Sequence, residues 1–524
     1  MKPNIFTKSI NRNSKLIIAL ASGIAMGLTV APVEAWFLAW FAMIPLWLIV
    51  AIPKHKSKSS SLLPSLLWGF GYHGTALYWI TGLHPLTWLG VPWLGSIAIV
   101  VFCWLFISFW GGILVMLWSK LIKLFSTQNS LIRVLIGTAI WCILERIWSA
   151  GPLWWSSISY TQSPHNLVAL HLGQISGPTA VNAAIIAVNG LLAEALNTRF
   201  VQRQSQEGIS FQRLATIAIA LFVSLHLIGF GLYSRPLSQI PQAALKIGII
   251  QGNIPNRIKF KPQGSRRIMR NYTGGYLKLA NQDVQAVLTP EGALPFFEDE
   301  IIQSSVIAAV RQKNVLAWIG GYKRQGKDRY TNSLLTFTGS GEVYSRYDKE
   351  KLVPLGEYIP FENILGDIIN RLSPVTARQI PGKSNQIVKT PFGNATVGIC
   401  YGSAFAEQFR NQTATGGEFI ITASNNDPYS AAMQFQHHAQ DIMRAIENDR
   451  WAARATNTGY SAFVNPHGKT LWISGHDTYE THAETIYRRQ TQTLYVRWGD
   501  WLSWVLGALG IGVWVWERKV IGNW

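Results

Sequence analysis

Long apolar segments limit what this chain can fold into more than any other feature. They lie at 15–32, 36–52, 62–83, 92–117, 131–149, 167–195, 213–233 and 499–517. Each is close to the ~20 residues that a helix needs to cross a bilayer. Only 14% of the 524 residues are charged, and a soluble domain usually has about a quarter. We therefore predict a polytopic α-helical membrane bundle of about eight spans, the first of which is an anchor rather than a signal peptide.

The Lys and Arg residues fall in alternate loops, which predicts the orientation. They precede the first segment and follow the second, fourth, sixth and eighth. These residues are Lys2, Lys8, Arg12, Lys15, Lys54, Lys56, Lys58, Lys120, Lys123, Arg133, Arg199, Arg203, Arg213, Arg518 and Lys519. The other loops, around 33–35, 84–91 and 150–166, contain no Lys or Arg. Cytoplasmic loops carry the basic excess, so we expect both termini inside and the region 234–498 outside.

The region 234–498 has the pattern of a separate α/β domain. Short β-rich stretches such as "LKIGIIQGN" and "ATVGICYG" alternate with helix-like stretches such as "EIIQSSVIAAVRQKN". Such alternation is typical of a domain with buried strands. The predicted organisation is a seven-span domain at 1–233, the α/β domain at 234–498, and a final helix with a cytoplasmic tail at 499–524. The net charge of +19 indicates cytoplasmic loops and anionic lipid rather than nucleic acid.

Three predicted strands each end at a reactive side chain. Glu291 follows "AVLTP", Lys349 follows "SRYD", and Cys400 follows "TVGI". Reacting groups gather at the carboxyl ends of strands in open α/β sheets. A cation stabilises a thiolate, and a carboxylate can take the thiol proton during attack on an acyl group. Together the three side chains predict a nucleophilic cysteine site, with backbone N–H groups after Cys400 helping Lys349 to hold an oxyanion.

Each of these residues also has a structural alternative. Cys400 is alternatively a buried strand thiol, as Cys103 and Cys142 are expected to be in their apolar segments. Glu291 is alternatively an acid in the first turn of a helix after Pro290. Lys351 competes with Lys349, because strand alternation puts both on one face. A surface ion pair is the alternative role for either lysine.

The same stretches carry a family resemblance that covers nearly the whole chain. The domain at 234–498 resembles the nitrilase, or carbon–nitrogen hydrolase, fold, which implies an α-β-β-α sandwich. With flanking spans it is similar to the apolipoprotein N-acyltransferase family. The matching stretches are "QGNIP" at 251–255, "TPEGALPF", "YDKEKLVPLGEYIPF", "GICY", "RATNTGYSAFVNPHGK" and "ILERIWSAGPLWWSSISYTQ".

The resemblance implies a role for each matched residue. Glu291 is the implied general base, Lys349 the transition-state stabiliser and Cys400 the nucleophile. Glu357 matches a second acid beside them, and Tyr401 matches the residue after the nucleophile.

One loop of the family and the residue after Tyr401 depart from the pattern. In "SNNDPYS", Asn425 fits the family's Asn and Tyr429 stands in for its Phe. Asn426 replaces its Asp and Pro428 its Trp, and Gly402 stands where the family commonly has Glu. These changes concern the preferred acyl donor.

The resemblance also implies the reaction and its partners. A phospholipid would donate an acyl chain through a Cys400 thioester to the α-amine of a diacylglyceryl apolipoprotein. The site would then be on the periplasmic side of a bacterial inner membrane, in a protein that we expect to be a monomer with no cofactor. A membrane-tethered amidase acting on a small C–N substrate, or an inactive lipid-binding or transport protein, remains the alternative.

Two other groups of polar residues, apart from Glu291, Lys349 and Cys400, are expected to have structural roles. His437 and His438, in "QFQHHAQD", read as one polar helical face, and their spacing matches no metal-ligand motif. We therefore expect no metal site. Glu145 and Arg146 lie near the outer end of a span, where charge is costly without a partner, and we expect them to form a structural ion pair.

Overall fold

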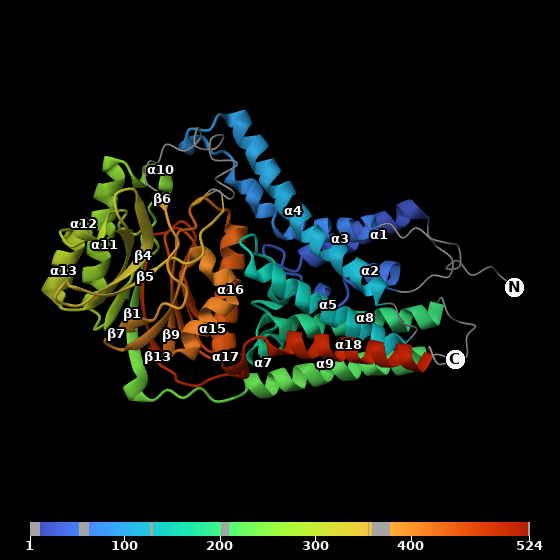
Figure 1. Ribbon diagram of the computed structural model, residues 1–524. Helices are drawn as coiled ribbons and strands as arrows, with labels where there is room; N and C mark the ends of the chain where they lie inside the picture. The colour runs from blue at the N-terminus through green and yellow to red at the C-terminus, as the bar shows by residue number, and fades with distance from the viewer. Residues whose placement is uncertain are drawn as a thin grey trace. The chain divides into compact units, whose positions relative to one another are not determined.

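The computed structural model describes residues 11–51, 62–125, 129–200, 209–354, 356–358 and 378–521. The chain divides into two compact units (Figure 1). The first comprises Met1–Thr81, Ile97–Arg235 and Asp500–Trp524, and the second comprises Gly82–Ser96 and Pro236–Gly499.

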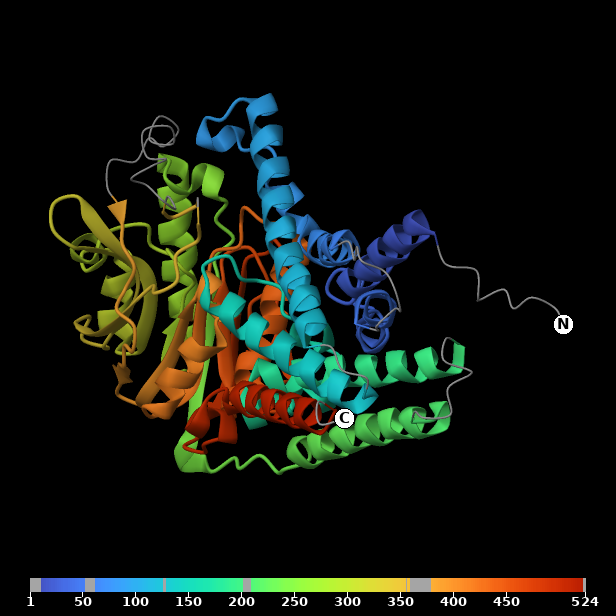
Figure 2. The same ribbon diagram turned by 45° about the vertical axis from the view of Figure 1, so that its right-hand side comes forward.

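Helices make up the first unit. Its elements are α1 (Arg12–Gly27), η1 (Trp36–Trp40), α2 (Ile44–Val50), α3 (Leu63–Ala76), η2 (Tyr78–Leu83), α4 (Trp93–Leu124), α5 (Ser130–Ala150), η4 (Ile158–Gln162), α6 (Leu167–Leu170), α7 (Gly173–Ser176), α8 (Pro178–Phe200), α9 (Phe211–Tyr233) and α18 (Trp501–Ile521). Helices α1 and α3 lie side by side (Figure 2), because Gly23 lets the two backbones approach. A Cβ at Gly23 would lie 2.1 Å from the Trp68 carbonyl oxygen.

Three helices within the described residues are long and apolar enough to cross a membrane. They are Trp93–Leu124, Pro178–Arg199 and Phe211–Tyr233. The prediction of about eight spans therefore stays a prediction. Three predicted spans are not single helices in the described residues: 36–52 contains η1 and α2, 62–83 contains α3 and η2, and 167–195 contains α6, α7 and part of α8. The break before α8 occurs where Gly177 adopts a φ of 63° and Pro178 begins the new helix, as proline favours the first helical turn.

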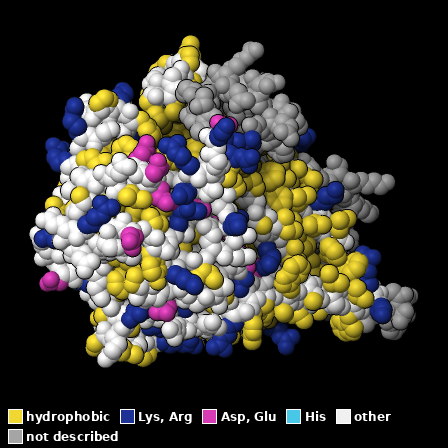
Figure 3. Space-filling model, turned by 60° about the vertical axis from the view of Figure 1, so that its left-hand side comes forward, with side chains coloured by type: hydrophobic (Ala, Val, Ile, Leu, Met, Phe, Trp, Pro, Cys, Tyr) yellow, Lys and Arg dark blue, Asp and Glu magenta, His cyan; other side chains and the backbone are white. Residues whose placement is uncertain are grey.

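Large apolar side chains remain exposed along several helices of the first unit. They include Phe102, Phe106 and Phe109 on α4, Ile219, Leu227 and Phe230 on α9, and Trp504, Leu509 and Trp516 on α18. Figure 3 shows hydrophobic side chains gathered over part of one face of the molecule. Contiguous apolar surface of this kind is what a membrane solvates and water does not.

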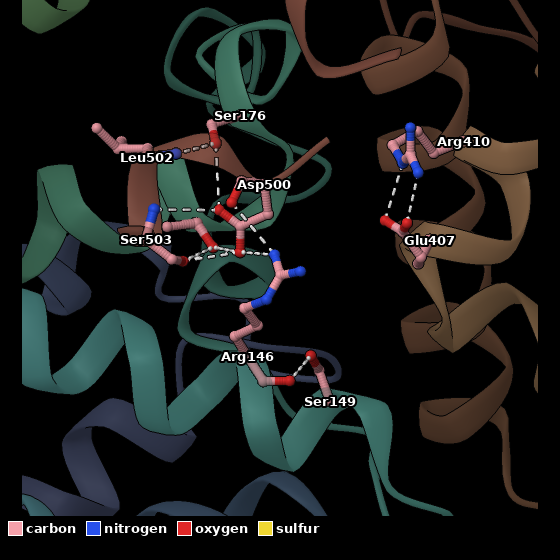
Figure 4. Close-up of polar contacts among 9 residues, drawn as sticks. Arg146, Ser149, Ser176, Glu407, Arg410, Asp500, Leu502 and Ser503 are labelled. Carbon is pink, nitrogen blue, oxygen red and sulfur yellow. Dashed lines mark hydrogen bonds and ion pairs between the residues drawn. The ribbon is translucent and has the colours of Figure 1, made fainter. Parts of the chain in front are cut away.

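Two expectations about charges in this unit are wrong. Arg133 is not a loop residue; it is buried in α5 and its Nε donates to Glu194 Oε1 on α8 at 2.7 Å. Arg146 does not pair with Glu145; its Nη1 lies 3.0 Å from Asp500 Oδ2, before α18 (Figure 4). Glu194 and Asp500 are remote in sequence from these arginines, so local spacing could not predict either pair. Such pairing satisfies charges that would otherwise be costly in an apolar unit.

Two β-sheets form the centre of the second unit. The seven-stranded sheet has the order β13 (Glu480–Tyr487), β1 (Ala244–Gln251), β2 (Ala286–Leu288), β3 (Leu316–Arg324), β4 (Arg329–Phe337) and β5 (Val343–Asp348), with β6 (Arg378–Gln379) also paired to β4. The six-stranded sheet has the order β12 (Thr470–Ile473), β11 (Ala462–Val464), β10 (Ala452–Thr456), β9 (Gly417–Ser424), β8 (Gly393–Ile399) and β7 (Val388–Thr390). The prediction of an α/β domain is confirmed.

The other elements that the structure describes in the second unit are helices. They are η3 (Thr87–Leu89), η5 (Pro241–Ala243), α10 (Asn256–Lys259), α11 (Pro262–Ala280), α12 (Glu298–Ile301), α13 (Ser305–Lys313), η6 (Cys400–Ala404), α15 (Ala406–Ala414), α16 (Ala431–Asn448) and α17 (Leu494–Trp498). Figure 1 shows α11 and α13 against one sheet and α15 and α16 beside the other.

Strand alternation explains the layers. On β1, Ile247 and Ile249 pack into the core that both sheets share, where Val397 and Ile421 come from the second sheet. Ile250 points the other way, into the core that α11 and α13 cover. Successive side chains point to opposite faces of a strand, so a strand with apolar residues on both faces needs cover on both. The result is a helix–sheet–sheet–helix sandwich.

Candidate active site

Glu291 is held in the turn after β2 by close contact with β3. The Thr289 amide donates to the Trp318 carbonyl at 3.0 Å. A Cβ at Gly320 would lie 2.0 Å from the Pro290 carbonyl oxygen, so only glycine lets the turn lie directly on the strand. Glu291 is buried, with 7% of the residue's surface exposed.

Lys349 follows β5, and its ammonium meets two carboxylates. Nζ donates to Glu291 Oε1 at 2.8 Å and to Glu357 Oε1 at 2.7 Å. Burial lowers the pKa of this ammonium, but the Glu291 and Glu357 carboxylates outweigh burial and raise it well above its ordinary value. Lys351 does not share this position: its Nζ lies 3.6 Å from Glu350 Oε1. Strand alternation does not relate the two lysines, because β5 ends at Asp348.

Two further donors orient the Glu291 carboxylate. Asn332 Nδ2, from β4, donates to Oε1 at 2.8 Å. The Asn425 amide donates to Oε2 at 2.9 Å. Neither contact was predicted. Asn332 lies on β4, next to the residue that follows β5: the Lys349 amide donates to the Asn332 carbonyl at 2.8 Å. The carboxylate is therefore fixed from both sides before any substrate binds.

Cys400 begins η6 directly after β8 and adopts a strained backbone conformation. Its φ is +47°, in the left-handed region that non-glycine residues rarely occupy. Such strain persists only where the surroundings enforce it, and it is common at functional sites. Cys400 is buried, with 5% of its surface exposed. The backbone N–H of Asn425, which donates to Glu291 Oε2, also lowers the pKa of the Cys400 thiol. A mere strand thiol would not require this backbone geometry.

The charges of Glu291, Lys349 and Glu357 all act on the Cys400 thiol. Burial raises the pKa of this thiol to about 12, Glu291 adds to the rise, and Lys349 opposes it. The resting group at neutral pH is therefore the thiol rather than the thiolate. A proton acceptor must take the proton as the sulfur attacks. Of the two carboxylates that act on the thiol, Glu291 has the larger effect.

The structure places the other predicted residues around this centre. Glu357 contacts Lys349 directly, and the Val353 amide donates to its Oε2 at 2.8 Å. Asn425 contributes its backbone amide, while its side-chain Oδ1 accepts from Asn457 at 3.1 Å. Tyr401 packs its ring edge-on against Phe405, with centroids 5.0 Å apart.

Tyr429 and Lys259 complete the surroundings. Burial raises the pKa of the Tyr429 hydroxyl, and Cys400 and Glu357 act in the same direction. Lys259 on α10 was not predicted; burial lowers its pKa to about 8, against the pull of Glu291 and Asp427. Its only sequence signal was a position shortly after the "QGNIP" match.

The two halves of the chain match two family models. Residues 22–191 match the apolipoprotein N-acyltransferase N-terminal domain, and residues 246–495 match carbon-nitrogen hydrolase. Among solved structures, the chain is similar to an amidase from Nesterenkonia sp., with 16% identity, a TM-score of 0.37, and coverage of 49% of this chain and 94% of that one.

Curated relatives match along nearly the full length. The apolipoprotein N-acyltransferase of Nostoc sp. is 61% identical, covering 93% of this chain and 97% of the relative. The proteins of that name from Synechocystis sp. and Thermosynechococcus vestitus are 47% and 40% identical, covering 94% and 98% of this chain and 98% and 97% of the relatives. The chain belongs to the apolipoprotein N-acyltransferase family.

Proposed function

We propose that the protein transfers an acyl chain from a membrane phospholipid to the α-amine of a diacylglyceryl-cysteine at the N-terminus of an apolipoprotein. One observation carries the proposal: the Lys349 ammonium lies 2.8 Å from Glu291 and 2.7 Å from Glu357, beside a strained cysteine. In a member of this family, that arrangement supports acyl transfer through a thioester on Cys400.

The first half-reaction acylates Cys400. Glu291 takes the thiol proton as Sγ attacks the ester carbonyl of the phospholipid. The carbonyl oxygen becomes an oxyanion, which Lys349 and the Tyr401 amide stabilise. The tetrahedral intermediate then expels the lyso-phospholipid alkoxide, which takes the proton from Glu291. The acyl group remains as a thioester, and Glu291 is again a carboxylate.

The second half-reaction deacylates Cys400. The neutral α-amine of the apolipoprotein attacks the thioester carbonyl, and Glu291 accepts a proton from the amine. The C–S bond breaks, an amide forms, and the departing sulfur regains the proton from Glu291. Lys349 stabilises the oxyanion in both halves, so a single charge arrangement serves two chemically related transition states.

The membrane setting of the reaction is also part of the proposal. About eight spans would anchor the domain 234–498 on the periplasmic side of a bacterial inner membrane, with the domain 1–233 before it and the helix and tail 499–524 after it. Both termini would be cytoplasmic and the protein a monomer. The apolar faces of α4, α9 and α18 support membrane insertion, and two lipid-anchored substrates would meet such a site within the plane of the bilayer.

The proposal is tested by following a labelled acyl chain. The full-length protein in nanodiscs is given a phospholipid labelled in one acyl chain, together with a diacylated lipopeptide carrying a free N-terminal amine. We expect label in amide linkage on the lipopeptide with the wild type and none with Cys400→Ala, while Cys103→Ala retains activity as the matched control. Release of ammonia from small amides without lipid transfer would support an amidase instead. Absence of both reactions would support an inactive lipid-binding protein.

A further inference from the structure

A buried histidine on α16 contacts the backbone of the proposed nucleophile. His437 Nε2 lies 2.9 Å from the Cys400 carbonyl oxygen. The other ring nitrogen, Nδ1, lies 3.0 Å from Asn426 Nδ2. The side chain is fully buried, with 0% of its surface exposed. The polar helical face expected from "QFQHHAQD" is therefore part of the interior.

The two contacts define which ring nitrogen carries the hydrogen. A carbonyl oxygen only accepts, so Nε2 must be the donor. An amide Nδ2 only donates, so Nδ1 accepts from Asn426. Burial lowers the pKa of His437 to about 3, with the Arg454 charge acting in the same direction, and the neutral ring agrees with both contacts. His437 is thus a neutral imidazole with one fixed tautomer.

Helix α16 presents several side chains of one face to the turn that contains the nucleophile. His437, Asp441 and Arg444 follow the i, i+4, i+7 spacing of a single helical face. Arg444 Nη1 donates to the Ser403 carbonyl at 3.4 Å, and Asp441 is buried between them on this face, where it pairs with Arg454. His437 acts at the first residue of η6, while Arg444 acts near its end.

The contact to the Cys400 carbonyl has a consequence on the other side of the same peptide. The peptide that joins Cys400 to Tyr401 is planar and trans, so its N–H points opposite to its carbonyl. Fixing the carbonyl towards α16 therefore fixes the Tyr401 N–H away from α16. The positive φ of Cys400, +47°, is a conformation that the chain does not adopt without such support.

We propose that His437 is a positioning residue: its Nε2–H holds the Cys400 peptide so that the Tyr401 N–H is aimed at the oxyanion. This inference rests on the proposed acyl-transfer function. In this role His437 acts through the peptide plane rather than on the substrate or the sulfur. Asn426 supports it by fixing the tautomer, which gives a role to one of the positions where this chain departs from its family's pattern.

The test separates oxyanion stabilisation from the reactivity of the thiol. His437→Met removes the donor, and His437→Gln retains an N–H at a similar reach. The matched control is His438→Met, because His438 is the next residue, is also buried, and contacts Thr470 instead, with Nε2 3.0 Å from Oγ1. For each full-length variant, single-turnover acylation of Cys400 by phospholipid and alkylation of Cys400 by iodoacetamide are measured.

We expect His437→Met to slow acylation about 10- to 100-fold, the effect of misplacing an oxyanion donor. Alkylation forms no oxyanion, so its rate should change less than about threefold, and so should the KM for phospholipid. His437→Gln should recover most of the acylation rate, and His438→Met should resemble the wild type. Should His437→Met fail to fold, Asn426→Leu, which releases the tautomer, should still slow acylation more than alkylation.

Failure of the proposed acyl transfer and failure of the positioning role of His437 give different results. If the wild type forms no acyl-Cys400 at all, the proposed function fails and the role of His437 fails with it. If the wild type is acylated, but the His437 and Asn426 variants slow acylation and alkylation equally or slow neither, the acyl transfer stands and the positioning role is overturned.

Discussion

Lys349 and Glu291 form a buried ion pair in which Nζ lies 2.8 Å from Oε1, and the two side chains are only 2% and 8% exposed. The same ammonium lies 2.7 Å from Glu357. The pair is therefore asymmetric. Lys349 has two carboxylate partners, whereas Glu291 has one ammonium partner, which it shares with Glu357. Removing one partner of a buried pair leaves an uncompensated charge, which commonly costs about 3–5 kcal/mol.

This asymmetry predicts that Lys349→Met destabilises the protein more than Glu291→Gln. The first substitution leaves two carboxylates without their ammonium, whereas the second leaves Lys349 paired with Glu357. We expect Lys349→Met to lower the midpoint of thermal unfolding further, by several degrees for a difference of about 1–2 kcal/mol. The measurement is thermal unfolding of the detergent-solubilised variants at pH 7. An equal or reversed order would contradict the shared-ammonium arrangement.

The raised pKa of Cys400, about 12, predicts an unusual alkylation profile. Because the thiolate is the reacting form, the rate constant for iodoacetamide should rise about tenfold per pH unit without a plateau near pH 9. The profile is measured by mass spectrometry of the peptide containing Cys400, between pH 7 and the highest pH at which the protein stays folded. A plateau near neutral pH would instead indicate a thiolate at rest.

Substitutions of the two neighbouring charges should shift this profile in opposite directions. Glu291 raises the pKa of the thiol and Lys349 lowers it. At fixed pH, Glu291→Gln should therefore alkylate faster than the wild type and Lys349→Met more slowly. Both variants should nevertheless lose acyl transfer, since one lacks the base and the other the oxyanion partner. Faster alkylation together with lost catalysis distinguishes a proton acceptor from a group that merely activates the thiol.

Lys259 gives a stability prediction with a defined sign. Burial lowers its pKa from 10.5 to about 8, so between these values the unfolded chain binds more protons than the folded protein. Stability then rises with pH through that window, and the full burial cost is present below about pH 8. Lys259→Met should remove this component. From pH 8 to pH 10.5, the unfolding midpoint of the wild type should therefore rise relative to that of Lys259→Met. Lys278→Met, on the exposed side of α11, is the control and should show no such change.

The predicted part of the site and the missed part differ in their physical origin. Glu291, Lys349 and Cys400 were predicted because each directly follows a strand. Strands β2 and β5 belong to one sheet and β8 to the other, so these residues come from strand ends of both sheets. Asn332 was missed because a strand interior offers no local signal for which polar side chain faces a site. His437 was missed because its helix has polar residues that are buried under the second sheet rather than solvated.

The fold shows the same division. Apolar periodicity predicted the strands of the second unit and most helices of the first. The break in 167–195 was visible as Gly177–Pro178 but was outweighed by the apolar run around it. The partners of Arg133 and Arg146 lie 61 and 354 residues away in sequence, and nothing near either arginine identifies them. Contacts of that kind depend on how helices pack, which local spacing does not encode.

The acyl group on the nucleophile is the direct evidence for a thioester mechanism. Full-length protein is incubated with phospholipid and no acceptor, digested, and its peptides are analysed by mass spectrometry before and after neutral hydroxylamine. We predict a hydroxylamine-labile acyl adduct on the peptide containing Cys400, which disappears when a diacylated lipopeptide is added. An unmodified Cys400 peptide in protein that still acylates the lipopeptide would contradict the thioester mechanism.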